Sequence, residues 1–285
     1  MVNKKSIYFC LVMSALFFLT GCDEYQEQVQ NKLKIKHVFS RPSTAYGPGS
    51  IVLYTKDTGY TNTCYPEWTI GKAMEDIRKT EYKEDSIADL SVKKTAELEF
   101  DIKLDANERG KIGSKYEDIS KVKLTLDKGK QFELKTPIQT IYDNAKNNSS
   151  CSSNMKLRYN SNPDGKFYLV IVAYAYNMDY SVEDKAGLRI DGEIPAGVLK
   201  ILSAKAGIKL EANEEFKLQG ENLFIGFNGD IVPSPKEGDF TMAAKDWRKV
   251  KGDDISATIK TGAESKEVLY LKDITDVVRK IANYR

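Results

Sequence analysis

The segment Lys166–Tyr180, KFYLVIVAYAYNMDY, constrains the fold of this chain more than any other stretch. In an extended strand its tyrosines would share one face and its aliphatic residues would share the other, so both faces are apolar. Such a segment is typical of a central strand covered on both sides. We therefore expect the tyrosine row to belong to a core. The alternative is that Tyr174, Tyr176 and Tyr180 form an exposed face that binds a glycan or a protein, because tyrosine joins an apolar ring to a polar tip.

Other segments show the alternation of strands with one buried face. Glu97–Leu104 places four apolar side chains on one side and charges on the other, and Lys121–Leu126 repeats this pattern. Alternation of this kind predicts antiparallel strands. We expect a turn at Asp127–Lys130 after the second strand, and further short strands over Val198–Ala212.

A few helices accompany these strands. Thr136–Ala145 has the Thr-Pro start of a helix, and Asp273–Tyr284 has apolar residues spaced for one helical face. Asn147–Asn154 is polar, and we interpret it as a loop. The pattern predicts an α+β fold that is mainly antiparallel β, like a β-sandwich with few helices, or two β-rich subdomains with a soft boundary near residue 150.

The N-terminus has the layout of an export signal. Lys4 and Lys5 precede the apolar run Ile7–Leu19, which is too short to span a bilayer, since spanning takes about 20 residues. A basic start followed by such a run is typical of a signal peptide. The run leads into Leu19-Thr20-Gly21-Cys22.

This tetrapeptide resembles the lipobox of bacterial lipoproteins. The resemblance implies that residues 1–21 are removed by cleavage between Gly21 and Cys22, and that the Cys22 thiol carries a diacylglycerol. Further acylation of the new amino group is common in that family, and several acyl chains make an anchor stable where one does not. The alternatives are an ordinary secretory peptide and an uncleaved signal anchor.

The residues after Cys22 suggest a location and a linker. In enterobacterial lipoproteins, aspartate after the lipidated cysteine favours the inner membrane, so Asp23 favours that membrane, facing the periplasm, in a Gram-negative host with this rule; the outer membrane is the alternative. Residues 22–34 are polar and Gln-rich. We interpret them as a lipidated tether, and residues 35–285 as the globular region.

Two cysteines remain after export. Cys64 and Cys151 form an even pair in an oxidising compartment, so we predict a disulfide between them. The alternative is two separate buried thiols.

Charge and histidine content exclude several classes of function. The chain has 43 basic and 41 acidic side chains, and loss of Lys4 and Lys5 leaves 41 of each. A neutral chain without a basic block argues against nucleic acid as a partner. His37 is the single histidine, so a zinc site with several histidines is excluded and any Ser-His-Asp triad would need this residue. We interpret it as a surface histidine, and we expect no metal and no cofactor.

The function that these features favour is a non-enzymatic envelope module, anchored to the membrane through Cys22, that binds a protein or an envelope polymer. The sequence lacks the common catalytic signatures. The main alternative is a tethered hydrolase of peptidoglycan or glycan that uses dispersed carboxylates. A pore-forming β module would need long amphipathic hairpins, which the sequence does not indicate.

Overall fold

The computed structural model of the protein describes residues 24–87, 91–190, 194–208, 220–227, 231–232 and 271–283. Gly21 and Cys22 lie outside these residues. The helices are α2 (Glu24–Leu33), α3 (Pro66–Ile70), α4 (Met74–Thr80), α5 (Ala106–Ile112), α6 (Ile138–Asn147), α7 (Ser149–Ser161), α8 (Ala196–Lys205) and α10 (Thr275–Asn283). The strands are β1 (His37–Ser43), β2 (Ile51–Thr55), β3 (Gly59–Cys64), β4 (Tyr82–Ser86), β5 (Ala96–Asp101), β6 (Ile119–Leu134), β7 (Lys166–Val170), β8 (Val172–Asp184), β9 (Gly220–Phe227), β10 (Ile231–Val232) and β11 (Leu271–Asp273).

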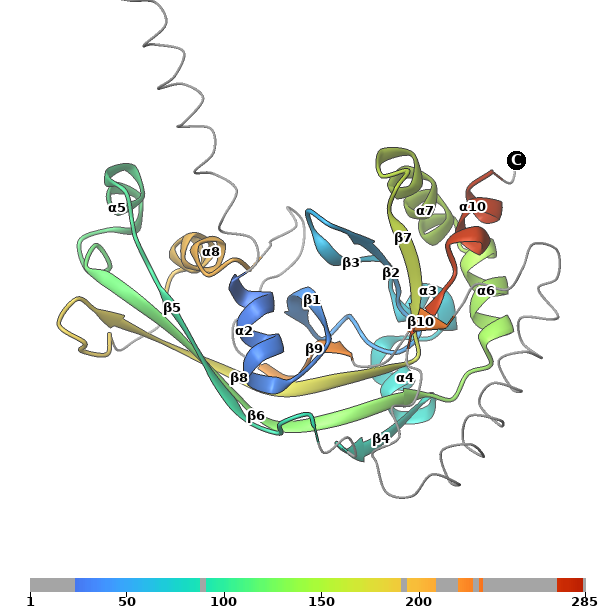
Figure 1. Ribbon diagram of the computed structural model, residues 1–285, viewed down its shortest axis with the longest axis horizontal. Coiled ribbons are helices and arrows are strands. Elements are labelled where there is room, and N and C mark those ends of the chain that lie inside the picture. Colours follow the sequence, from blue (N-terminus) through green and yellow to red (C-terminus); the bar gives the residue numbers. More distant parts are fainter. Residues whose placement is uncertain are drawn as a thin grey trace, which may run out of the picture.

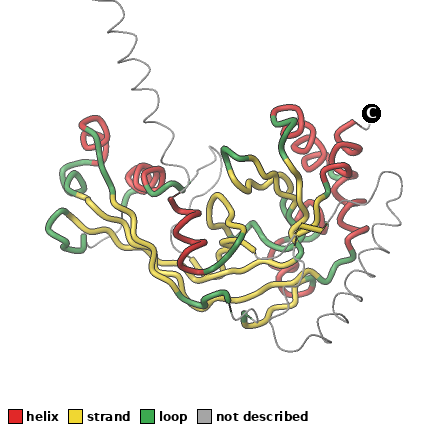
Figure 2. Tube along the Cα trace, in the orientation of Figure 1, coloured by secondary structure: helices red, strands yellow, loops and turns green. Residues whose placement is uncertain are grey.

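The strands form one curved sheet (yellow in Figure 2) in the order β10-β11-β7-β2-β3-β1-β9-β8-β6-β4, with β5 also paired to β6. The β1–β3 and β10–β11 pairs are parallel, and the other pairs are antiparallel. Figure 1 shows α5 and α8 near one end of the sheet, α6, α7 and α10 near the other end, and α2 between them. The prediction of an α+β fold dominated by antiparallel strands is confirmed, and its strands belong to one continuous sheet.

Two long strands run through this sheet. β6 has 16 residues and β8 has 13, and the two pair along most of their length. The turn expected at Asp127–Lys130 is wrong, because the chain continues through these residues with a bulge. Gly129 serves close packing there: a Cβ at this position would lie 2.6 Å from Cε1 of Tyr176. Although long, β6 and β8 are no hairpin, since α6, α7 and β7 separate them along the chain.

The buried residues fall into two clusters. One lies among β2, β3, β7, α6 and α10, and includes Phe167 and Ile274. The other lies among α2, β5 and α8, and includes Phe100 and Leu202. Both clusters draw on residues before and after position 150, so the chain does not divide there. β6 and β8 contribute to both, which joins the two cores in one fold.

The segment expected to be a flexible tether is the first helix of the fold. Tyr25, Val29 and Leu33, spaced four residues apart on α2, are each 0% exposed and belong to the second cluster. The tether interpretation of residues 22–34 is therefore wrong from Glu24 onward. Three apolar side chains on one helical stripe anchor a segment that is otherwise polar.

Two other expectations about local structure are wrong. α8 occupies Ala196–Lys205, where short strands were expected, and it buries Val198 and Leu202. The polar segment expected to be a loop begins α7, where the side-chain oxygen of Asn148 accepts a hydrogen bond from the Cys151 N–H at 3.0 Å. This bond caps the helix. α6 and α10 confirm the helices predicted before and after them.

Candidate functional site

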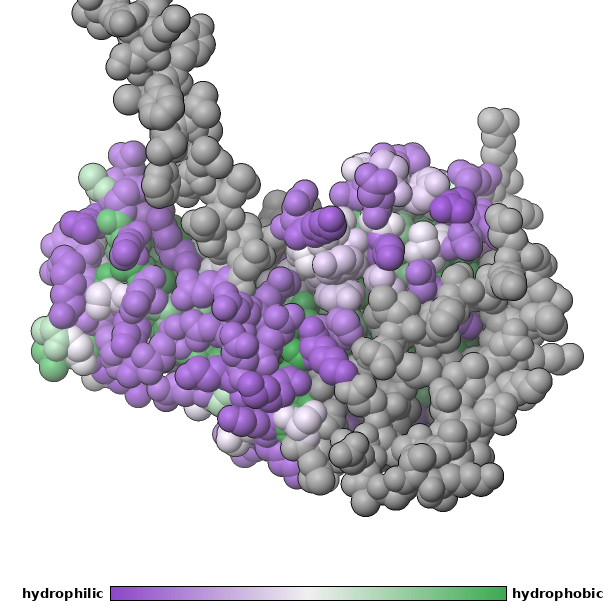
Figure 3. All heavy atoms as spheres, viewed as in Figure 1, coloured by the Kyte–Doolittle hydropathy of each residue, from purple (hydrophilic) through white to green (hydrophobic). Residues whose placement is uncertain are grey.

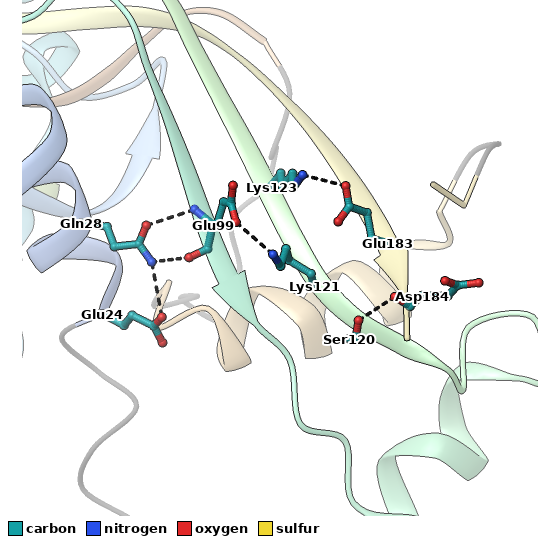
Figure 4. Close-up of polar contacts among 8 residues, drawn as sticks. All are labelled: Glu24, Gln28, Glu99, Ser120, Lys121, Lys123, Glu183 and Asp184. Atoms are coloured by element: carbon teal, nitrogen blue, oxygen red, sulfur yellow. Dashed lines mark hydrogen bonds and ion pairs between the residues drawn. The ribbon is translucent and has the colours of Figure 1, made fainter. Parts of the chain in front are cut away.

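The face around α2 is the candidate site, because only Asp23 lies between Cys22 and the first residue of this helix. In Figure 4 the helix lies beside strand β5. Gln28 Oε1 accepts a hydrogen bond from the Glu99 N–H at 3.0 Å, and Gln28 Nε2 donates to the Glu99 carbonyl oxygen. The side chain of Gln28 thus pairs with the main-chain N–H and C=O of Glu99 on an edge strand. Unpaired groups on such a strand are available for pairing with another chain.

A ladder of ion pairs crosses the neighbouring strands β5, β6 and β8 (Figure 4). Lys121 Nζ lies 3.0 Å from Glu99 Oε2, and Lys123 Nζ lies 2.7 Å from Glu183 Oε1. The hydrogen bond from Lys121 holds the pKa of Glu99 below its usual value. All four side chains are partly exposed, and ion pairs at exposed sites contribute little to stability. The ladder therefore defines a polar sheet face more than it stabilises the fold.

The opposite face of the same strands is apolar. Leu98, Val122 and Val182 are buried in the second cluster, beneath the ladder. The strict alternation predicted for β5 is confirmed. These strands thus present charges on one face and a packed core on the other.

The tyrosine row lies in the core. Tyr174 and Tyr176 are 0% exposed, and the Tyr176 hydroxyl donates to the Lys93 carbonyl oxygen at 2.7 Å. Burial raises the pKa of Tyr176. Tyr180 is half-buried and packs against the second cluster. The core interpretation is correct for Tyr174 and Tyr176, and the alternative of an exposed binding face is wrong for these two residues.

The two cysteines predicted to form a disulfide, Cys64 and Cys151, meet at the other end of the molecule. Cys64 Sγ lies 2.01 Å from Cys151 Sγ, as in a disulfide, with the Cα atoms 5.0 Å apart. Both residues are fully buried. The bridge joins the end of β3 to the first turn of α7.

His37 lies in an aromatic cluster and is half-buried, whereas a surface position was expected. Its Nδ1 is 3.0 Å from the Tyr60 hydroxyl oxygen, and its ring stacks on Phe227 with centroids 5.0 Å apart. Burial raises the pKa of Tyr60. This arrangement gives His37 a packing role between β1, β3 and β9.

Glu67, at the start of α3, has the environment closest to that of a catalytic acid. Burial raises the pKa of its carboxyl group, and its Oε2 has no hydrogen-bond partner in the described part of the chain. The positive charge of Arg78 lowers the pKa of Glu67 and that of Tyr82, against the larger effect of burial. Glycoside hydrolysis needs a second carboxylate beside the first, whereas the charged side chain that acts on Glu67 is the cation Arg78.

The residues that the structure describes hold neither a metal-binding cluster nor a helix suited to spanning a membrane. Across the described ranges, no group of three or more His, Cys, Asp and Glu side chains is placed to hold a metal ion. Among the described helices, none has the length and hydropathy needed to cross a bilayer.

Comparison with known proteins adds little to this geometry. No family model and no curated protein matches the chain. Among solved structures, a bacterial gasdermin from Bradyrhizobium tropiciagri is similar, with 14% sequence identity, coverage of 71% of this chain and 83% of that chain, and a TM-score of 0.30. A TM-score this low does not establish a common fold, so no functional argument rests on this likeness.

Proposed function

We propose that the protein is a bacterial envelope lipoprotein whose folded part is a non-enzymatic binding module held directly at the membrane. The lipobox-like Leu19-Thr20-Gly21-Cys22 supports the anchor. The claim that the folded part is held directly at the membrane is supported by α2, which begins at Glu24 and buries Tyr25 completely. An extended chain covers about 3.5 Å per residue, so the first residue of the helix lies within about 7 Å of the lipidated cysteine.

This anchor defines a location. The module lies in the cell envelope, and Asp23 favours the inner membrane, facing the periplasm, in a Gram-negative host that sorts by this residue. The outer membrane is the alternative location. Its partner is a protein or an envelope polymer and not a nucleic acid.

The binding face of this module is the ion-pair ladder on β5, β6 and β8. Its carboxylates and ammonium groups lie on the polar side of the sheet, close to α2 and therefore close to the membrane (Figure 4). Because surface ion pairs are weak, a charged partner can replace them at little cost.

A tethered hydrolase is the second candidate, and the raised pKa of Glu67 is the observation that favours it. Its test is release of fragments from peptidoglycan by the wild-type chain and by Glu67→Gln. Release by the wild type alone would favour the hydrolase over the binding module.

The test of the proposed function compares the lipidated chain with Cys22→Ser in envelopes of the host. We expect the wild type in the membrane fraction and the variant in the soluble fraction. Crosslinking from the ladder should then capture one partner, and Lys121→Glu with Lys123→Glu should weaken that capture. Membrane retention of Cys22→Ser would contradict the anchor, and capture unchanged by the lysine substitutions would contradict the binding face.

A further inference from the structure

We infer that α5 and α8 form a docking surface for anionic phospholipid headgroups beside the lipid anchor. The inference rests on the proposed function, because it requires acyl chains on Cys22. It adds a second membrane contact, made by the folded part of the chain, that would fix how the module is oriented on the bilayer.

The position of the two helices is the first support. α5 and α8 pack against each other, and Lys205 Nζ on α8 lies 2.9 Å from Glu108 Oε1 on α5. Figure 1 places both helices on the same side of the sheet as α2, with α8 near the first turn of α2. Side chains of all three helices belong to the second cluster, so they form one packed unit.

The charge of this end is the second support. Lys103, Arg109, Lys111 and Lys200 are exposed. Within the described part of the chain none of these four side chains forms an ion pair. Figure 3 shows this end of the molecule as predominantly hydrophilic. Four cations without such a partner are available to an anionic surface.

The neighbouring carboxylates are largely engaged. Asp105 accepts a hydrogen bond from the Glu108 N–H at 2.9 Å, and Glu108 accepts one from the Asp105 N–H at 2.9 Å, which caps α5. Glu108 also pairs with Lys205, and Asp118 pairs with Lys185. Exposed Asp101, Asp105 and Glu117 form no ion pair within the described residues, so the four cations exceed these carboxylates by one.

The short link to Cys22 is the third support, and it selects a membrane as the occupant. Attraction between a cation and an anionic membrane acts within about 8 Å at physiological ionic strength. A long tether would let these helices leave that range. A fold that begins within about 7 Å of the anchor keeps the first turn of α2 close to the headgroups, and α8 lies near this turn (Figure 1).

The experiment places an environment-sensitive probe on the lipidated full chain in vesicles. The probe is attached at Lys111→Cys, at Lys200→Cys, or at the control Lys79→Cys on α4, which lies away from α5 and α8 in Figure 1. Under the proposed function no other thiol reacts, because Cys10 is removed with residues 1–21, Cys22 is modified and Cys64 is bonded to Cys151. A quencher on the headgroups reports proximity, in vesicles of phosphatidylcholine with or without phosphatidylglycerol.

We expect quenching at positions 111 and 200, and not at position 79, in the vesicles that contain phosphatidylglycerol. The quenching at position 200 should be lost in Lys103→Glu with Arg109→Glu and kept in the matched reversal Lys79→Glu with Lys83→Glu. Equal quenching at all three positions, in a chain that floats with the vesicles, would overturn the docking surface alone. A chain that does not float with the vesicles would overturn the lipid anchor and this inference with it.

Discussion

Gln28 on α2 binds the main chain of Glu99 in β5 through both ends of its amide, with the Glu99 N–H donating to Gln28 Oε1 at 3.0 Å. The two residues are 71 positions apart. The contact joins the first helix of the fold to an edge strand. Together with the buried stripe of α2, it makes the segment after Cys22 part of the folded module.

Gln28→Ala should lower the free energy of unfolding by about 1 kcal/mol, because it removes both hydrogen bonds to Glu99 and a third to the Glu24 side chain at a partly exposed site. Urea denaturation of the soluble Cys22→Ser chain measures this change. Gln30→Ala is the matched control on the same helix, since within the described residues Gln30 Nε2 donates a single bond, to the Lys36 carbonyl oxygen. Equal losses in the two variants would show that the Glu99 contact adds nothing specific.

Tyr25 gives two substitutions with opposite expected effects. Tyr25→Ala should cost about 3–5 kcal/mol, as expected for a large side chain removed from a core. Tyr25→Phe should leave stability unchanged or raise it by up to about 1 kcal/mol, because the buried hydroxyl has no partner in the described part of the chain. Thermal unfolding of both variants measures the difference. If Tyr25→Ala unfolds at the same temperature as the wild type, the packing of α2 in the core is contradicted and the tether interpretation is favoured.

Cys64→Ser with Cys151→Ser should lower stability by about 4–5 kcal/mol, because the bridge closes a loop with a sequence separation of 87. Urea denaturation with and without reductant measures this. The reductant should destabilise the wild type and leave the double variant unchanged. Alkylation of a free thiol in the unreduced wild type would contradict the disulfide.

Glu81 links the end of α4 to the segment before α6, and it should make stability depend on pH. A hydrogen bond from Lys72, together with one from the Thr136 hydroxyl at 2.8 Å, lowers the pKa of Glu81 from 4.5 to about 2. A depressed pKa contributes stability above the unfolded pKa, and that stability is lost as the pH falls toward the folded pKa. The advantage of the wild type over Glu81→Gln should therefore be full at pH 7 and fade between about pH 4.5 and 2.

Denaturation curves across this pH range measure that advantage. Glu117→Gln serves as the control, because Glu117 is exposed and forms no ion pair within the described residues. An advantage over Glu81→Gln that stays constant down to pH 2 would contradict the account of this contact.

The sequence predicted the elements whose pattern is strict. Leu98 and Phe100 alternate with charges in β5, and Val277, Val278 and Ile281 form one face of α10. The burial of Tyr174 and Tyr176 followed from a strand that is apolar on both faces. In each case the side-chain period alone specifies which face is buried.

The elements that were missed depend on contacts between distant segments. α2 has one apolar stripe among glutamines, and its partners in β5 lie far along the chain. Val198 and Leu202 fit a strand or a helix equally well by period, and packing beside α5 decides for the helix. Gly129 is typical of a turn by sequence, but in the structure its missing side chain leaves room for the ring of Tyr176. For the same reason the ladder of β5, β6 and β8 was not predicted, since its lysines meet carboxylates from two other strands.

The mass of the N-terminal peptide from membrane-extracted protein tests the central claim most directly. The account predicts a peptide that begins at Cys22, carries a diacylglycerol on the thiol and continues into the sequence of α2. A mature chain that begins at another residue, or that has an unmodified Cys22, would contradict both the anchor and the placement of α2 at the membrane surface.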